Sequence, residues 1–277
     1  MEENVAIGND HVQGLLNYLR DTGERPVVYL CEPPPGVPIR SGESVKHTML
    51  VHDGRAVADH LTLDSQGFAF VHNDSEVENF YDPDEVRRIY YPEVARLVKH
   101  VTGAFRVEVF DHNVRCEPMA RQKINGAHEP VKFAHNDYTL KSGPQRVRDL
   151  MGEEAEELLK HRFIEINVWR PIRGPVEESP LAVCDAQSMS LSDFIPTDLK
   201  YSDRTGEVYS LKYNSNHRWY YFPKMKRNEV LLLKCYDSAT DGRASFTAHT
   251  AFDDPMSPPG APARESIESR MLAFFAE

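Results

Sequence analysis

Two short stretches of the sequence place a histidine two positions before an aspartate, an economical way to hold a metal ion. The stretch FVHNDSE contains His72 and Asp74, and the stretch FAHNDYT contains His135 and Asp137. Residues two apart on a β-strand point to the same face, so either pair would direct an imidazole and a carboxylate to one point. The chemistry then depends on which pair can recruit a further ligand.

The residues around the two pairs favour the second pair, His135 and Asp137, as the metal site. Ser75 with Glu78 three positions later is a capping-box pattern, so the first pair is expected to end a strand and lead into a helix. After Asp137 the chain continues for 140 residues (277 − 137), in which further strands can supply a ligand. Two histidines and one carboxylate on one face of an ion are the ligand set of mononuclear non-haem Fe(II) oxygenases.

Two downstream histidines compete for the third position. His249 stands in SFTAHTAFDDP, after an apolar strand and before an arginine-containing C-terminal segment, and His217 stands in YNSNHRWYYFP. We expect His249 to be the ligand. His217 is the reserve, and it would otherwise line the mouth of the site.

Residues near the C-terminus are suited to holding a dicarboxylate co-substrate such as 2-oxoglutarate. Arg264 and Ser266 share a face if a strand begins there, and Arg270 enters the last apolar strand. A guanidinium binds a carboxylate bidentately, so either arginine can serve as the clamp. Asn167 is polar within an apolar strand and must find a hydrogen bond, on the co-substrate or on the backbone.

Aromatic residues on two strands predict a wall of the substrate pocket. Trp219 and Tyr221 share one face of the strand that follows His217, and Trp169 shares a face with Asn167. We expect Trp169, His217, Trp219 and Tyr221 to border an apolar substrate, the alternative for each aromatic residue being packing in the core.

The elements that must position these residues are mostly short strands. From residue 105 onward, segments rich in β-branched and aromatic residues alternate with turns, and only 144–162 is clearly helical. This pattern indicates a barrel or jelly roll rather than alternating strands and helices. Upstream, we expect a helix over 10–20, a strand over 25–31, and a helical stretch from 75 that ends at Gly103. The predicted division is an N-terminal elaboration, 1–104, packed on a catalytic core, 105–277.

Composition narrows the class of partner. With 43 acidic and 32 basic residues the net charge is −11, which argues against nucleic acid as the main partner. No apolar run approaches the roughly 20 residues of a membrane helix, and the polar N-terminus does not resemble a signal peptide. The four cysteines are scattered, as expected for free thiols in a reducing compartment. We therefore expect a cytoplasmic protein that acts on a small molecule, with a homodimer as an open alternative to a monomer.

Several ordered motifs resemble one known family. They are FDHNVR, AHNDYT, NVWRP, PLAVCDA, NHRWYYFPKM, LLLKCYDS and HTAFDDP followed by ARESIESR, and the likeness spans roughly 50–275. The sequence is similar to the family of fungal gibberellin desaturase-like proteins, aspergillic acid hydroxylase, the cephamycin methoxylase small subunit and the novofumigatonin endoperoxidase. That resemblance implies a double-stranded β-helix (cupin-like jelly roll) that uses Fe(II), 2-oxoglutarate and O2 to hydroxylate, desaturate or cyclise a specialised metabolite.

The same resemblance carries a ligand set onto this chain. His135 and Asp137 match the first two iron ligands, and His249 matches the third by its place before the arginine-containing strand. Arg264 follows His249 by 15 positions, a longer gap than in many related oxygenases, so Arg264 and Arg270 remain in competition as the clamp. Two other classes stay open: a metal-dependent hydrolase or isomerase on the same barrel, and a non-catalytic partner subunit.

Overall fold

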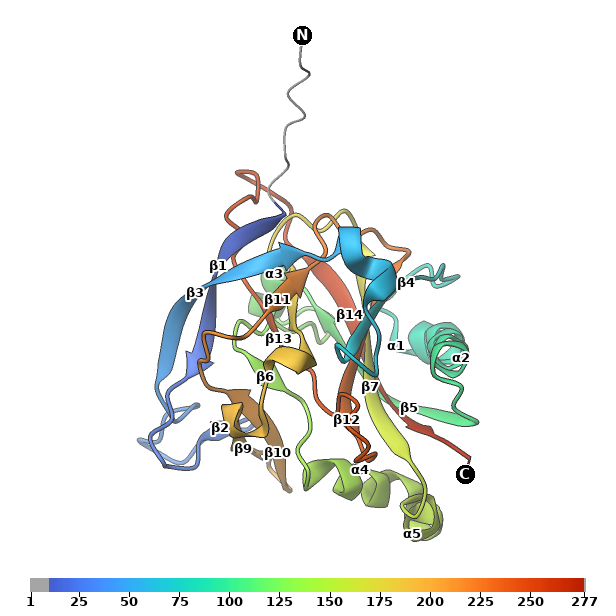
Figure 1. The fold of residues 1–277 in the computed structure, drawn as a ribbon. Helices are drawn as coiled ribbons and strands as arrows, with labels where there is room; N and C mark the ends of the chain where they lie inside the picture. The colour runs from blue at the N-terminus through green and yellow to red at the C-terminus, as the bar shows by residue number, and fades with distance from the viewer. Residues whose placement is uncertain (1–9, 277) are drawn as a thin grey trace.

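The computed structural model describes residues 10–276, whose strands form two sheets that face each other (Figure 1). One sheet has nine strands in the order β1-β3-β11-β8-β13-β6-β10-β9-β2, and the other has five in the order β4-β12-β7-β14-β5. Neighbouring strands are antiparallel except for the parallel pairs β3–β11 and β2–β9. These curled sheets confirm the predicted all-β jelly roll with flanking helices. The strands are β1 His11–Leu19, β2 Val27–Tyr29, β3 Ser44–Asp53, β4 Phe68–His72, β5 Arg106–Arg115, β6 His135–Asn136, β7 Phe163–Arg173, β8 Leu181–Cys184, β9 Phe194–Lys200, β10 Thr205–Leu211, β11 Trp219–Tyr221, β12 Glu229–Asp237, β13 His249–Ala251 and β14 Glu265–Phe274.

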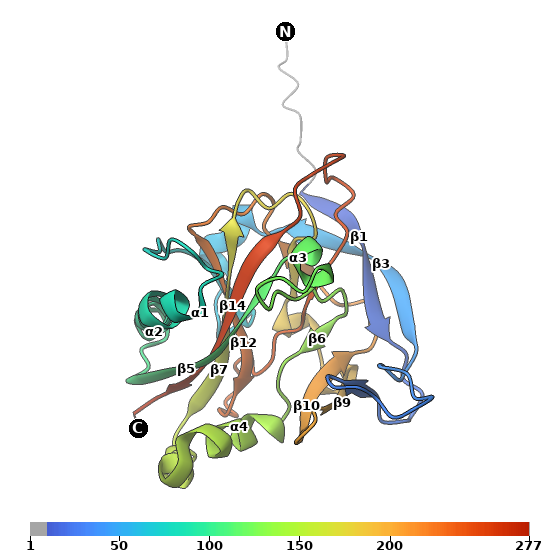
Figure 2. The same ribbon diagram turned by 180° about the vertical axis from the view of Figure 1, so that it is seen from behind.

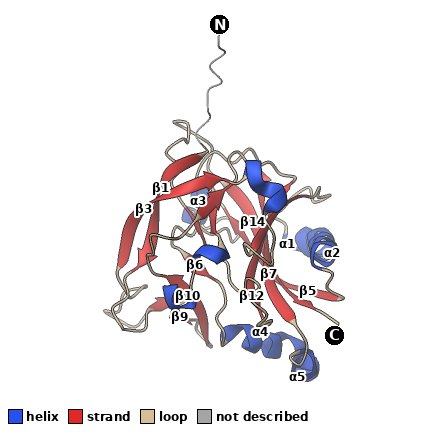
Figure 3. Ribbon diagram, viewed as in Figure 1, coloured by secondary structure: helices blue, strands red, loops and turns tan. Residues whose placement is uncertain are grey.

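The helices lie outside the two sheets (Figures 2 and 3). The longest helical segment runs through α1, a π-turn and α2, and it packs on the five-stranded sheet. Within residues 10–276, none of the helices has the length and apolar character needed to span a bilayer. The helices are α1 Pro83–Glu85, α2 Tyr91–Thr102, α3 Glu117–Arg121, α4 Ser142–Met151 and α5 Ala155–Leu158, with the π-turn at Val86–Tyr90 and 3-10 turns at Arg55–His60, Gly152–Glu154, Ala186–Ser188 and Leu191–Asp193.

Alternation along the five-stranded sheet separates two apolar layers. In β7 the odd residues, such as Phe163 and Trp169, pack between the sheets, and the even residues Ile164 and Ile166 pack under α2. This is the expected behaviour of a strand buried on both faces. Every residue of β7 from Phe163 to Pro171 is buried, so a polar residue at an odd position is held inside the barrel.

A bulge in β5 redirects its second half toward the barrel interior. Arg270 of β14 pairs with Asp111 and the next residue, Met271, pairs with Val109, so Phe110 has no opposite partner. One extra residue reverses which face the alternate side chains occupy. Val109 therefore packs in the layer under α2, whereas Asp111 and the residues two and four positions further on line the interior.

Three predictions about the elements need correction. Residues 11–19 form β1 rather than a helix, because the chain pairs along its whole length with β3 and its alternate residues are buried. The helix before α2 begins at Pro83 and is capped by the Asp82 carboxylate, which accepts from two backbone amides. Ser75 does not cap it, since its hydroxyl donates to Glu93 at 2.6 Å.

Other predicted elements hold or are shorter. Gly103 ends α2 with a φ of +75°, as expected for a helix C-terminus. Within the segment 131–139, only His135–Asn136 forms a strand. Strand β9 was not predicted, and its Pro196 is a residue that is rare inside strands. Strands of the first 104 residues belong to both sheets, with β1, β2 and β3 in one and β4 in the other. The division at residue 104 stays a prediction.

Candidate metal centre and active-site cavity

Three of the predicted ligands meet at one point between the sheets. One donor atom each from His135, Asp137 and His249 lies within 4.8 Å of the other two. The two imidazole rings have centroids 4.5 Å apart, and His135 Nε2 is 3.4 Å from an Asp137 carboxylate oxygen. These spacings leave room for a single ion in contact with all three side chains. Among the residues that the structure describes, no other group of this kind occurs.

Backbone pairing explains why the histidines converge. His249 of β13 is the register partner of His135 of β6, so their side chains project from directly opposite positions. The residue between His135 and Asp137 turns the other way: the Asn136 amide donates to the carbonyls of Tyr138 and Cys235 at 2.6 and 2.8 Å. Asn136 thus ties this short strand to β12.

The hydrogen bonds of His135 set its tautomer for metal binding. Its Nδ1 is 2.7 Å from the carbonyl of Phe133, so Nδ1 carries the proton and donates to that oxygen. Nε2 then keeps its lone pair and faces Asp137. A histidine ligand held in this way by a backbone carbonyl is typical of metal sites.

The charge states of the other two ligands also favour metal binding. Burial lowers the pKa of His249, so the imidazole is neutral at pH 7. Burial alone would raise the pKa of Asp137, but the Arg270 guanidinium holds it well below its ordinary value. The site therefore presents a neutral imidazole at His249 and a carboxylate at Asp137, the protonation states that a divalent ion requires of these two ligands.

Two predicted co-substrate residues instead contact the aspartate. The Asn167 amide donates to Asp137 at 2.8 Å, and Arg270 Nε donates to the same oxygen at 3.1 Å. Arg270 also pairs with Asp111 at 2.9 Å and with Glu268 at 3.2 Å. A guanidinium with three carboxylate partners has little capacity left for a fourth. The arrangement orients Asp137 so that its other oxygen faces the histidines.

Arg264 and Ser266 are buried, and polar atoms of both lack hydrogen-bond partners among residues 10–276. Arg264 is 3% exposed, stacks over Trp169, and donates from Nη1 to the Ser179 carbonyl at 2.6 Å. Its Nε and the Ser266 hydroxyl have no hydrogen-bond partner within the described part of the chain. Burial, with the nearby Arg115, lowers the pKa of Arg264 to about 9. A desolvated cation beside an unsatisfied hydroxyl is a place where a carboxylate fits.

The reserve histidine and the predicted aromatic wall lie elsewhere. His217 is stacked on Tyr18 and lies 3.4 Å from Asp193, and it is not part of the ligand group. The indole of Trp219 donates to the Tyr18 hydroxyl at 2.7 Å. With Trp169 and Tyr221, these residues are buried in or beside the core between the sheets, and none of the four lines the cavity beside the ligands.

A cavity of about 1150 Å³ opens beside His135 and Asp137. Its walls come from β5, β9, β10, α4 and the loop between β2 and β3, and the phenylalanines Phe110 and Phe133 are among its apolar residues. A volume of this size accommodates a small-molecule substrate next to the ligands. The sequence predicted that the strand after His217 would line this cavity. In the structure it is lined largely by segments before β7 and by β9 and β10.

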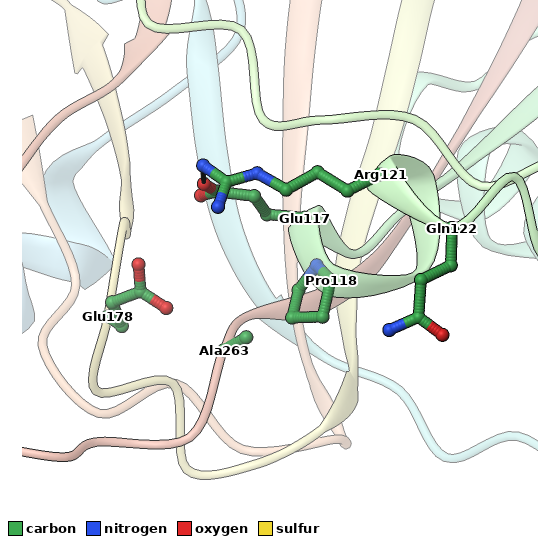
Figure 4. A pocket seen from close by; sticks show the side chains of 6 residues that line it. All are labelled: Glu117, Pro118, Arg121, Gln122, Glu178 and Ala263. Atoms are coloured by element: carbon green, nitrogen blue, oxygen red, sulfur yellow. Dashed lines mark hydrogen bonds and ion pairs between the residues drawn. The ribbon is translucent and has the colours of Figure 1, made fainter.

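A second, smaller hollow is lined in part by α3 and by Ala263, the residue before Arg264. It has a volume of about 400 Å³ and lies between α3 and the loops that carry Glu178 and Ala263. In Figure 4 the Arg121 guanidinium lies against the Glu117 carboxylate on α3, with Glu178 on the opposite side. None of the three ligands lines this hollow, so the chemistry belongs to the larger cavity.

Sequence reasoning missed part of the site on β5. Asp111, Asn113 and Arg115 all line the large cavity, and Arg115, which the sequence offers as a further candidate although a surface position explains it as well, is half-buried. The alternation of polar residues in FDHNVR was a visible signal. Which face those residues occupy depends on the bulge at Phe110, which local sequence does not reveal.

Comparisons with known proteins decide the family. A family model described as an oxidoreductase/YMDC permease-like domain matches residues 16–274. A Fe(II)/2-oxoglutarate-dependent dioxygenase of Aspergillus novofumigatus (strain IBT 16806) is 34% identical over 259 residues, covering 89% of this chain and 90% of its own. The chain belongs to the Fe(II)/2-oxoglutarate-dependent dioxygenases.

Other relatives in this dioxygenase family agree. A hydroxylase/desaturase of Hormonema carpetanum is 34% identical over 256 residues, covering 83% of this chain and 84% of its own. A solved variant of the iron and alpha-ketoglutarate-dependent endoperoxidase NvfI superposes with a TM-score of 0.90 at 30% identity, over 98% of this chain and 99% of that one. The resemblance found in the sequence motifs is thereby confirmed, as is the class of enzyme: a dioxygenase that uses Fe(II), 2-oxoglutarate and O2.

Proposed function

We propose that this dioxygenase binds Fe(II) through His135, Asp137 and His249, binds 2-oxoglutarate through Arg264 and Ser266, and oxidises a specialised metabolite in the large cavity. The observation that carries the proposal is the meeting of two imidazoles and a carboxylate within 4.8 Å, in a chain of this family. Three protein ligands leave open positions on the ion for co-substrate and O2. When bound, iron and 2-oxoglutarate supply the oxidising power that removes hydrogen from a substrate C–H bond, with succinate and CO2 as co-products.

Each protein group has a distinct part in this proposal. Arg270 and Asn167 fix the orientation of Asp137, because both donate to one of its oxygens. Arg264 and Ser266 supply a buried cation and hydroxyl for the far carboxylate of 2-oxoglutarate, and their unsatisfied atoms are the reason we prefer Arg264 to Arg270 as the clamp. The cavity walls hold the substrate C–H bond and exclude water, which is the protein's contribution to the rate. Hydroxylation, desaturation and ring formation share these requirements.

The test measures iron binding and co-substrate turnover together. Anaerobic protein loaded with Fe(II) and 2-oxoglutarate should show the visible charge-transfer absorption of a keto-acid chelate, and admission of O2 should yield succinate. His249→Ala should lose both signals, whereas the matched variant His217→Ala should retain them. Retention of both by His249→Ala would contradict the ligand set. Turnover of a substrate without 2-oxoglutarate or O2 would instead indicate a hydrolase or isomerase, and failure to bind iron would indicate a non-catalytic subunit.

Two further parts of the proposal concern the environment of the enzyme. We place it in the cytoplasm, supported by four cysteines without disulfide bonds, three of them buried. We retain a homodimer as the alternative to a monomer, and light scattering after gel filtration distinguishes a 31.6 kDa species from one of twice that mass.

A further inference from the structure

We propose that the substrate of this dioxygenase is an amphipathic organic acid, whose carboxylate pairs with Arg146 while its apolar part packs on Phe110 and Phe133. This inference rests on the proposed function, because it concerns what fills the cavity beside the ligands. It adds a class of substrate and a residue of α4 that binds it.

The charge of the cavity wall is opposite to that of the protein. Seven lysine and arginine side chains line the cavity against five aspartates and glutamates, whereas the whole chain has 32 basic and 43 acidic residues. The charges of bound Fe(II) and of the 2-oxoglutarate dianion cancel each other. The cavity wall therefore keeps its positive excess when both are bound. A cavity with such a wall attracts an anion.

Two of the arginines are already paired with four of the five carboxylates of the wall, and the fifth, Asp149, accepts a hydrogen bond from Gln145. Arg270 pairs with Asp111 and Asp137, and Arg25 pairs with Asp198 and Glu207. Five cationic side chains of the wall therefore have no carboxylate within 4.0 Å among residues 10–276. They are Arg40, Arg115, Lys141, Arg146 and Arg204.

Arg146 is the member of this set best placed to bind a ligand. It is half-buried on α4, its guanidinium lies 5.5 Å from the ring centroid of Phe110, and Gly143 on the same helix packs against a buried tyrosine ring. The buried Glu165 interacts with Arg146 electrostatically, but burial raises the pKa of Glu165 well above its ordinary value and so favours the neutral acid. Within residues 10–276, no carboxylate lies within 4.0 Å of the Arg146 guanidinium, which stands next to an apolar ring.

Arg40 repeats this pattern beside the ligands. Its guanidinium lies 4.5 Å from the ring centroid of Phe133, and the carbonyl of Phe133 holds His135. Phe110 and Phe133 each line the cavity next to an arginine, Arg146 and Arg40 respectively. This arrangement suits a molecule with an apolar body and one acidic group. A guanidinium binds a carboxylate through two parallel hydrogen bonds, which fixes the direction in which the apolar body extends. With the acid at Arg146, that body reaches across the rings toward His135.

The test compares acids with their neutral amides. Phenylalkanoic acids with three to five methylene groups, each beside its primary amide, are titrated calorimetrically into protein loaded anaerobically with Fe(II) and saturating 2-oxoglutarate. The co-substrate keeps its own site filled, so the acids report on the cavity. The best acid should bind at least about tenfold more tightly than its amide, the factor that 1.4 kcal/mol produces.

Variants of α4 assign this preference to one side chain. Arg146→Gln should reduce the acid-to-amide ratio by about tenfold, and Arg146→Lys should keep most of it. Arg148→Gln is the matched control, because Arg148 lies on the same helix, pairs with Glu156 and does not line the cavity. Equal affinities for acid and amide, no binding of any acid, or an unchanged ratio in Arg146→Gln would each overturn the inference. The charge-transfer absorption, recorded on the same samples, reports separately on the proposed function.

Discussion

Replacing Arg264 with methionine separates its effect on stability from its effect on co-substrate binding. Arg264 is 3% exposed and makes one hydrogen bond, to the Ser179 carbonyl. The fall in its pKa from 12.5 to about 9 corresponds to on the order of 5 kcal/mol at 1.36 kcal/mol per pH unit. This burial penalty disappears in the variant, while the Ser179 carbonyl loses a partner worth about 1 kcal/mol. We expect the ligand-free variant to be about 1–4 kcal/mol more stable than the parent, the range found when buried ions are replaced by apolar residues.

The response to 2-oxoglutarate should change in the opposite sense. At a concentration of 100 times Kd, the co-substrate stabilises the parent by about 2.7 kcal/mol. Loss of a charge-assisted pair of about 1.5–3 kcal/mol weakens binding by roughly 10- to 150-fold. At the same concentration the gain of the variant then falls to between about 1.4 and 0.3 kcal/mol.

Urea unfolding of Mn(II)-loaded protein, with and without 2-oxoglutarate, measures both quantities. Arg173→Met is the control, because the side chain of Arg173 is 72% exposed and should leave both quantities unchanged. The reasoning fails if Arg264→Met keeps the full gain on adding 2-oxoglutarate. It also fails if the ligand-free variant is several kcal/mol less stable than the parent, since the guanidinium would then be well compensated within the protein.

Three further outcomes are expected. Asp137→Ala should reduce iron affinity at least about 100-fold by metal analysis, whereas Asp84→Ala, whose side chain is 94% exposed, should not; equal iron contents would contradict the ligand set. The pKa values of Asp137 and His249 are both lowered in the folded state, so the unfolded chain binds more protons in acid. The metal-free protein should therefore lose stability as the pH falls from 7 toward 4. Urea midpoints that stay constant over this range would argue against this. Both Gly67 and Gly23 have positive φ, but only at Gly67 would a Cβ overlap a threonine hydroxyl. In thermal unfolding, Gly67→Ala should therefore be destabilised by about 2–3 kcal/mol more than Gly23→Ala. Equal losses of stability would show that the threonine side chain moves aside.

Local periodicity was enough to predict that two of the three clustered side chains point in one direction. The two-residue spacing of His135 and Asp137 is a property of any strand, so their common direction follows from the sequence alone. That His249 rather than His217 joins them is a matter of register between strands distant in the chain. The preference for His249 came from its place before an arginine-containing strand, and the family resemblance supplied the rest.

The predictions that failed depended on contacts beyond the local segment. Residues 11–19 carry leucines at a spacing compatible with a helix, and only pairing with β3 makes them a strand. Local sequence does not place Arg115 or Arg146 in a cavity wall, because their positions depend on the bulge in β5 and on the docking of α4. The aromatic residues after His217 pack in the core, the alternative that the sequence left open for each of them, since a strand buried on both faces gives no local sign of which face meets a ligand.

The direct pairing of β6 with β13 has a consequence for how the enzyme acquires its metal during folding. The two histidines are separated by 114 positions (from 135 to 249), and β6 contributes only His135–Asn136 to the sheet. Closing so long a segment is entropically unfavourable and late, and ion binding cannot offset it until the closure is complete. The nascent chain should therefore be indifferent to iron until β13 has been synthesised and docked, and added metal should slow unfolding without accelerating refolding.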